Sequence, residues 1–141
     1  MVGLPLGERF MAEKSVNGPW TDVVIDTKTY TVFRDGSPVT EGHLLFVPKE
    51  ETMECLMACY KAAYAWGYGW VKENYCDGYN IGQNIGESAG QTVMWPHVHL
   101  IPRRTGDIAD PQGGVRHVIP KIDNYKQQEF DWDNLSHGQT A

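Results

Sequence analysis

Residues 90–104 read GQTVMWPHVHLIPRR, and this segment carries most of the information about the fold. Side chains two residues apart on a β-strand point to the same face, so His97 and His99 share one face. Val98 and Leu100 then point to the opposite face, into a core. The pattern predicts a strand that begins at His97, buries one face and presents two imidazoles on the other.

Upstream of this strand, three apolar runs predict an antiparallel meander. Val23–Ile25 and Tyr30–Phe33 are rich in β-formers and are separated by a polar turn. Gly42–Pro48 is a third short apolar run, closed by a proline. A further strand begins at Tyr79, after the Asp77-Gly78 turn. With one helix between the third and fourth strands, the predicted order of elements is β-β-β-α-β-β.

The helix is the one clear 3.6-residue pattern in the chain. Thr52 is a suitable residue for its N-terminus. Six apolar residues at helical spacing predict its buried face: Met53, Leu56, Met57, Tyr60, Ala63 and Tyr64. Gly67 and Gly69 predict that the helix ends or weakens there. The fold class is therefore α+β, an antiparallel sheet meander with one main helix packed on it.

Length and composition indicate one ordinary globular domain. The chain has 141 residues, of which 41% are hydrophobic and 21% charged. We expect a single domain over residues 1–141, with a core of about 20–107 and with 108–141 as a C-terminal arm or loop segment. The net charge of −6 argues against a protein that coats nucleic acid, so no nucleic-acid partner is expected.

Two further features indicate the compartment. The three cysteines, Cys55, Cys59 and Cys76, are sparse and odd in number, which suits a reducing compartment better than a disulfide framework. No apolar run approaches the roughly 20 residues of a membrane span, and the first residues show no signal-peptide pattern. A cytoplasmic protein without membrane attachment is expected.

A glycine-rich loop precedes the two-histidine strand. Gly82, Gly86 and Gly90 let the backbone approach a ligand closely and present N–H groups to phosphate oxygens. Two imidazoles beside such a loop suggest phosphoryl-group chemistry. From the residues alone, the pattern predicts a phosphate-handling site on an α+β domain.

The same segment resembles the signature of the histidine-triad (HIT) family, His-φ-His-φ-His-φ-φ. His97 and His99 match the second and third histidines, and Trp95 stands where the family has the first. The upstream Gly42-His43 before an apolar strand also resembles the family pattern. The resemblance extends from about Val23 to Asp107.

The resemblance implies roles for seven residues. It implies catalytic roles for His97, the nucleophile, and for His99 and His43. It implies substrate contacts from Asp35 to the ribose and from Asn84, Gln91 and Thr92 to phosphate. From the residues alone, Asp35 is equally well explained as a turn residue.

The reaction that the resemblance implies is hydrolysis at the α-phosphate of a nucleotide conjugate, such as a dinucleoside polyphosphate or a nucleoside phosphoramidate. His97 forms a nucleotidyl-histidine that water then cleaves. No cofactor or structural metal is expected, and Mg²⁺ enters only as a counter-ion of a polyphosphate substrate. A homodimer is expected by the same resemblance, with Trp132 as a residue that reaches the partner's site.

Three alternatives remain open. The loss of the first histidine at Trp95 favours a nucleotide-binding module with little or no turnover. Transfer of the nucleotidyl group to an acceptor phosphate would make the protein a nucleotidyltransferase. The cluster His43, His97 and His99 is also a three-histidine set that suits Zn²⁺, although no fourth ligand stands at a recognisable spacing.

Overall fold

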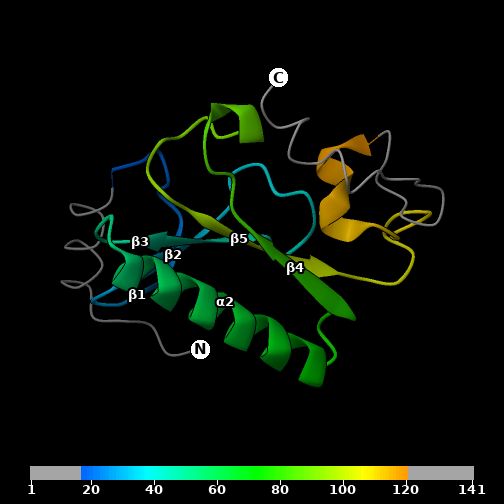
Figure 1. The fold of residues 1–141 in the computed structure, drawn as a ribbon. Helices are drawn as coiled ribbons and strands as arrows, with labels where there is room; N and C mark the ends of the chain where they lie inside the picture. Colours follow the sequence, from blue (N-terminus) through cyan, green and yellow to red (C-terminus); the bar gives the residue numbers. More distant parts are fainter. Residues whose placement is uncertain (1–16, 121–141) are drawn as a thin grey trace. The chain divides into compact units, whose positions relative to one another are not determined.

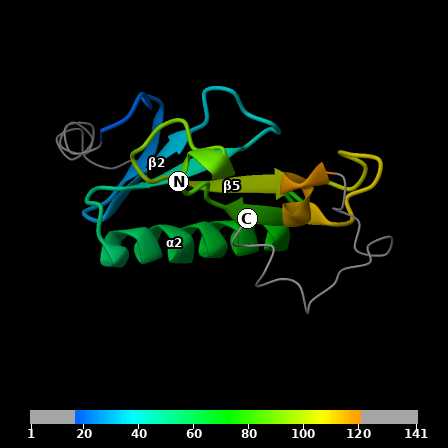
Figure 2. The ribbon, with the colours of Figure 1, turned by 45° about the horizontal axis from the view of Figure 1, so that its top comes forward.

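The computed structural model describes residues 17–120, and the chain forms two compact units, residues 1–107 and 108–141. The first unit contains a five-stranded antiparallel sheet in the order β1-β2-β3-β5-β4. The strands are β1 (Val23–Asp26), β2 (Tyr30–Arg34), β3 (Leu44–Pro48), β4 (Gly78–Gly82) and β5 (Val98–Arg103). The helix α2 (Met53–Lys72) runs along one face of this sheet (Figures 1 and 2). The predicted α+β class and order of elements are confirmed.

The sheet is apolar on both faces around its centre. On the face toward α2, the fully buried residues include Val32, Leu44, Phe46, Val98 and Leu100. On the opposite face, Phe33, Leu45 and Val47 form a second buried cluster, against which Trp20, Val23 and Trp95 pack. Strand β3 lies between β2 and β5 and is buried along its whole length, because a central strand covered on both faces has no side that meets water.

Strand β5 begins one residue later than the sequence predicts. Its ladder with β3 opens where Val98 faces Phe46, so His97 belongs to the end of the preceding loop. Pro96, just before it, has no N–H to donate to a ladder. The expected alternation holds within the strand, because Val98 and Leu100 are fully buried and His99 is only partly so.

Thr52 caps the helix as expected, and its hydroxyl accepts the Cys55 N–H at 3.2 Å. The helix does not end at Gly67 or Gly69 but continues to Lys72. Gly67 lies where the helix touches the sheet: a Cβ placed there would meet the Tyr79 ring at 2.5 Å. Packing against the sheet therefore offsets the low helix propensity of glycine at this position.

The predicted buried face of the helix is correct at Ala63, which is buried, and at Leu56 and Tyr60, which pack against the core, and it is wrong at the other three positions. The buried residues are Cys55, Cys59, Ala63 and Gly67, spaced four apart. By contrast, Met53 is 70% exposed and Tyr64 is 60% exposed, and Met57 is exposed as well. The small side chains let the helix approach the sheet closely, whereas the large aromatic ones, such as Trp66, which meets the Phe46 ring, pack along the flanks. A periodicity count treats cysteine and glycine as weak signals, so it missed Cys55, Cys59 and Gly67 and extended the face to Met53, Met57 and Tyr64.

Beyond the sheet, the described part of the second unit, residues 108–120, contains the short 3₁₀ helix η2 (Gly114–Val118). Trp132 lies outside the described residues. None of the described helices combines the length and the apolar character that a bilayer crossing requires. A single domain with a C-terminal arm stays a prediction.

We expect Gly67→Ala to lower the free energy of unfolding by about 1–3 kcal/mol, because the added methyl overpacks the contact with Tyr79. Gly69→Ala, on the same helix with open space around it, is the matched control and raises stability by up to about 1 kcal/mol through helix propensity. Urea unfolding of the two variants and the wild type measures both changes. Equal stabilisation by the two substitutions would contradict the close helix–sheet contact.

Candidate active site

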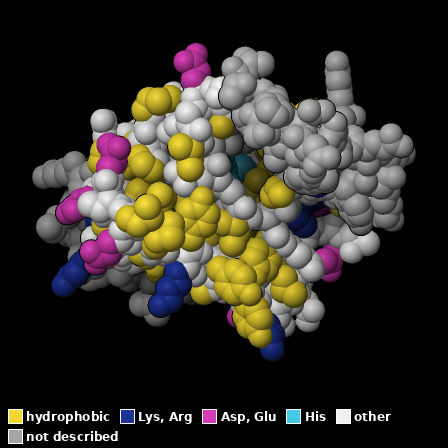
Figure 3. Space-filling view, viewed as in Figure 1, with side chains coloured by type: hydrophobic (Ala, Val, Ile, Leu, Met, Phe, Trp, Pro, Cys, Tyr) yellow, Lys and Arg dark blue, Asp and Glu magenta, His cyan; other side chains and the backbone are white. Residues whose placement is uncertain are grey.

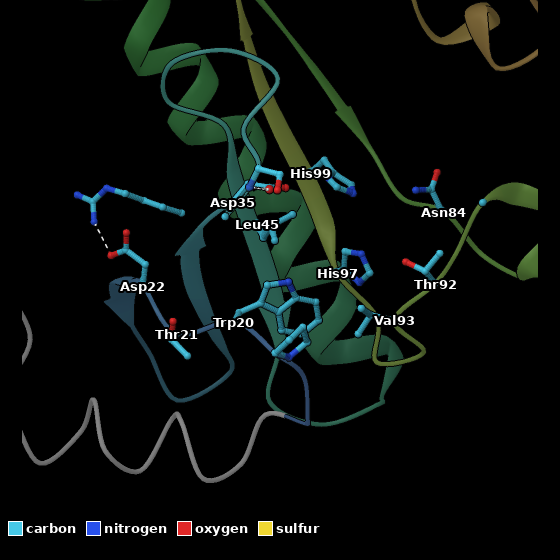
Figure 4. Close-up of a pocket in the computed structure, with 15 residues that line it drawn as sticks. Trp20, Thr21, Asp22, Asp35, Leu45, Asn84, Thr92, Val93, His97 and His99 are labelled. Carbon is cyan, nitrogen blue, oxygen red and sulfur yellow. Dashed lines mark hydrogen bonds and ion pairs between the residues drawn. The ribbon is translucent and has the colours of Figure 1, made fainter.

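A pocket of about 520 Å³ opens on the face of the sheet opposite α2 (Figure 4). Its walls come from the segment before β1, the end of β2 and the loop after it, β3, the β4–β5 loop and the start of β5. The lining residues are Pro19, Trp20, Thr21, Asp22, Arg34, Asp35, Gly36, Ser37, Leu45, Asn84, Gly90, Thr92, Val93, His97 and His99.

Five of the seven predicted site residues meet in this pocket: Asp35, Asn84, Thr92, His97 and His99. His43 is not in the lining. It lies behind His99, is 5% exposed, and contacts two lining residues, His99 and Asp35. Residues that lie up to 64 positions apart in the chain are thereby brought to one site.

The orientation of His97 is set by its own loop. Its Nδ1 lies 2.9 Å from the carbonyl oxygen of Trp95. A carbonyl can only accept, so Nδ1 carries the proton and Nε2 keeps its lone pair. The ring also packs against Trp20, with the ring centroids 4.9 Å apart. His97 is therefore held in the tautomer that leaves a nucleophilic nitrogen free.

His99 is oriented by a chain of two hydrogen bonds that starts at the backbone. The Val39 N–H donates to Nδ1 of His43 at 3.2 Å. A neutral His43 must then carry its proton on Nε2, which lies 2.9 Å from Nδ1 of His99 and donates to it. Neutral His99 consequently carries its proton on Nε2. The site thus presents a lone pair on His97 beside an N–H donor on His99, with the ring centroids 5.4 Å apart.

Burial keeps this second imidazole neutral. Burial, together with the nearby His43 and His97, lowers the pKa of His99 to about 4, against a smaller opposing effect of Asp35. Burial also lowers the pKa of His43, again opposed by Asp35. Both rings are neutral at pH 7, and the hydrogen-bond chain that requires neutral rings is maintained.

Asp35 has both a turn role and a site role. Its Oδ1 accepts the Ser37 N–H at 2.7 Å and closes the turn after β2. Its Oδ2 lies 3.4 Å from Nε2 of His43. The side chain is 17% exposed and lines the pocket, so one oxygen fixes the loop while the other faces the histidines.

Asp35, His43 and His99 also form a group whose potential ligand atoms lie within 4.8 Å of one another. This set replaces His97 of the three-histidine alternative with a carboxylate. The hydrogen bonding does not fit a metal ion, however. The Val39 N–H occupies Nδ1 of His43, so Nε2 carries a proton and has no lone pair to give a metal.

Gln91 does not line the pocket. Its Oε1 accepts the Gly86 N–H at 2.8 Å, and its Nε2 donates to the carbonyls of Val93 and Met94, each at 3.1 Å. The amide is thus used within the β4–β5 loop. Gly90, in the left-handed region with φ 95°, completes the turn in this loop and lines the pocket.

Trp95, which the sequence predicts to stand at the first histidine position of the motif, supports the loop before β5. Its indole N–H donates to the Pro48 carbonyl at 2.8 Å, and its ring packs on the cluster of Phe33, Leu45 and Val47. The side chain thereby ties the loop before β5 to the end of β3. The carbonyl that orients His97 belongs to this anchored residue.

Trp20, Asp22 and Arg34 are among the pocket residues that were not identified from the sequence. Trp20 and Asp22 precede β1, where no motif marks them, although the high tryptophan content is a signal for a ring-lined site. Arg103 and Arg104 lie outside the pocket. Arg103 pairs with Asp107, and Arg104 donates to the Glu41 carbonyl.

Residues 20–106 match the sequence model of the HIT domain. No curated protein sequence matches the chain significantly. A Zn-bound histidine triad family protein from Mycobacterium smegmatis is 25% identical, covers 72% of this chain and 77% of its own, and superposes with a TM-score of 0.60.

Two further solved structures are similar. A hypothetical histidine triad nucleotide-binding protein from Sulfolobus tokodaii is 27% identical over 74% of this chain and 72% of its own, with a TM-score of 0.56. The diadenosine triphosphate hydrolase of Plasmodium falciparum, solved with cyclomarin A, is 23% identical over 72% of this chain and 76% of its own, with a TM-score of 0.55. At that identity the similarity shows a shared fold.

We expect the free energy of unfolding to fall as the pH is lowered from 7 to 5. The pKa of His99 is about 4 in the folded protein, against an ordinary value of 6.5. Below pH 6.5 the His99 imidazole is protonated in the unfolded chain but stays neutral in the folded chain. Stability present at pH 7 is therefore lost progressively toward pH 4. Urea unfolding at the two pH values measures the loss.

The control is the same measurement on two variants. His99→Asn removes the titrating ring and shows a smaller pH dependence than the wild type, whereas His117→Asn, at an exposed histidine of the second unit, keeps the full dependence. If His99→Asn and the wild type lose stability equally, the low pKa of His99 is not the cause.

Proposed function

The chain belongs to the HIT domain family, and on that premise we propose that it hydrolyses a nucleotide conjugate at the α-phosphate through a nucleotidyl-histidine on His97. One observation carries the proposal: the 2.9 Å hydrogen bond that holds the His97 Nδ1 proton on the Trp95 carbonyl. This bond leaves Nε2 as a free lone pair in a pocket large enough for a nucleotide.

In the first step, Nε2 of His97 attacks the α-phosphorus. An N–P bond forms, the bond from phosphorus to the leaving oxygen or nitrogen breaks, and the leaving group keeps the electron pair. The leaving group takes a proton from water, and the hydroxide formed combines with the proton that the second step releases. Negative charge on the phosphate oxygens needs fixed donors. The Nε2–H of neutral His99 is one, and the side chains of Asn84 and Thr92 on the β4–β5 loop are two more.

In the second step, water attacks the same phosphorus and displaces His97. The N–P bond breaks, a P–O bond forms, and a nucleoside monophosphate and one proton are released. His97 returns to its starting tautomer, since the Trp95 carbonyl holds Nδ1–H throughout. In this scheme His43 is a positioning residue, because it acts on the substrate only by orienting His99.

The ligand class is supported by the relatives as well as by the pocket. The Sulfolobus tokodaii protein is described as nucleotide-binding, and the Plasmodium falciparum protein as a diadenosine triphosphate hydrolase. Within the pocket, Asp35 is the acceptor suited to ribose hydroxyls. We assign Gln91 to ordering the loop that presents the phosphate donors, because its amide is bound within that loop.

A nucleotide-binding module with little turnover is the second candidate. The observation that favours it is the tryptophan at position 95, where the family signature has a histidine. Hydrolysis is the better-supported reading, because the orienting group is a backbone carbonyl, which every residue supplies.

We further propose that two copies of the chain associate through α2 and β4. Met53, Met57, Tyr64 and Tyr68 are all exposed on α2, and apolar side chains gather over this helix (Figure 3). Strand β4 is an edge of the sheet, so it has backbone groups free to pair. The mass of the protein in solution tests this proposal. A cytoplasmic location also stays a proposal.

We expect His97→Asn to abolish nucleotide release, with a fall in rate of at least about a thousandfold, because the nucleophile is lost. Wild type and variant are incubated with diadenosine tetraphosphate and with an adenosine phosphoramidate, and AMP is followed by chromatography. AMP from the wild type alone establishes the mechanism. If neither protein forms AMP from the substrates while the wild type still binds added AMP, hydrolysis is overturned and the nucleotide-binding module is supported.

We expect Trp95→Phe to lower kcat by about fivefold to tenfold with little change in KM. The substitution keeps the ring and removes the hydrogen bond to the Pro48 carbonyl, which is worth about 1 kcal/mol. Trp70→Phe, on the helix side of the sheet, is the control and leaves kcat unchanged. A rise in KM with constant kcat would show that Trp95 contacts substrate and does not position His97.

A further inference from the structure

The pocket has two chemically different ends. At one end, His97 lies beside Asn84 and Thr92 of the β4–β5 loop, the groups that suit phosphate (Figure 4). At the other end lies Asp22, just before β1 (Figure 4). Arg34, the last residue of β2, also lines the pocket and pairs with Asp22. In the proposed function the phosphorus lies at His97 and the ribose at Asp35, which lies between these two ends. The base of such a nucleotide extends toward the rim.

From this arrangement we propose that the rim of the pocket reads the base of the nucleotide, and that the pair Asp22–Arg34 makes the site prefer guanine over adenine. This inference rests on the proposed function, because it takes the ligand to be a nucleotide. It adds the substrate class and the residues that select it.

Trp20 supplies the apolar wall along which a base can lie. Its indole lines the pocket, is partly buried, and packs on Phe33 with the ring centroids 6.0 Å apart. Aromatic side chains are the usual stacking partners of single bases, and they hold all bases about equally well. The Trp20 wall therefore contributes affinity for any base, and the specificity for one base comes from the polar groups at its edge.

Asp22 and Arg34 form that edge. Arg34 Nη1 donates to Asp22 Oδ1 at 3.0 Å, and the two side chains are 60% and 61% exposed. Their backbones are joined as well, since the Arg34 N–H donates to the Asp22 carbonyl at 2.9 Å. The pair thus presents carboxylate acceptors and guanidinium donors side by side, on a backbone that fixes their spacing.

The hydrogen-bonding edge of guanine is complementary to this pair, whereas that of adenine is not. The edge of guanine offers two adjacent donors, N1–H and the 2-amino group, which a carboxylate accepts together, and O6, which an arginine donates to. Adenine offers an unprotonated N1 at the same position, so the carboxylate would face a lone pair. Discrimination comes from this unfavourable contact as much as from the good one.

The size of the effect follows from the exposure of the pair. A good bidentate contact to a base edge discriminates by roughly tenfold to a hundredfold. Asp22 and Arg34 stand at the rim, where water competes for their hydrogen bonds. We expect the lower end of this range, about tenfold in affinity.

The experiment measures binding of the product nucleotides by calorimetry, which needs no turnover. GMP binds wild-type protein about tenfold more tightly than AMP, and IMP, which lacks only the 2-amino group, falls between them. Asp22→Asn offers an amide donor to adenine N1 and one acceptor fewer to guanine, so the ratio of GMP to AMP affinity falls to about one or below.

The ratio is the readout, because removing a negative charge strengthens binding of every anion. Glu51→Gln, which removes one charge outside the pocket, is the matched control and leaves the ratio at its wild-type value. Equal affinity of wild type for GMP and AMP, or a ratio unchanged by Asp22→Asn, overturns the inference while hydrolysis through His97 stands. Absence of binding by any of the three nucleotides overturns the inference and the nucleotide function together.

Discussion

The alternation of side chains along β5 is the constraint on which the rest of the site depends. Val98 and Leu100 are fully buried in the cluster beneath α2, and this burial fixes His99 on the other face, opposite Leu45 of β3. A register slip of one residue would bury the imidazole and expose two aliphatic side chains. The core that stabilises the sheet therefore also holds the donor histidine in the pocket.

Backbone groups decide the protonation of the histidines. The Trp95 carbonyl fixes the tautomer of His97, and the Val39 N–H fixes that of His43 and, through it, of His99. These groups do not depend on which side chain stands at position 95 or 39. A site of this kind therefore keeps a lone pair beside an N–H donor with a tryptophan at position 95. The indole at position 95 acts in support, through its hydrogen bond to the end of β3.

The pocket divides its tasks among segments with different origins. The β4–β5 loop is held together by the Gln91 amide, and in the proposed function it offers donors to phosphate. Strand β5 supplies His99, and the end of the loop before it supplies His97. The segment before β1 and the end of β2 supply the indole of Trp20 and the Asp22–Arg34 pair. In the proposed function, chemistry and base recognition rest on separate parts of the chain, so changes in the second need not disturb the first.

The sequence by itself determined the order of the elements, the cap at Thr52 and the outward face of His99, since each depends on residues close together in the chain. The histidine signature and its upstream partner His43 also identified the family. The helix face was predicted only in part: Ala63 is buried as expected, but Cys59 and Gly67 are buried because the sheet packs against them. The base end of the pocket was beyond it too. Asp22 and Arg34 become neighbours only when β1 pairs with β2, and tertiary packing alone places Trp20 against His97. Local pattern fixes which side chains share a face, whereas the partners across a pocket are decided by how separate segments pack.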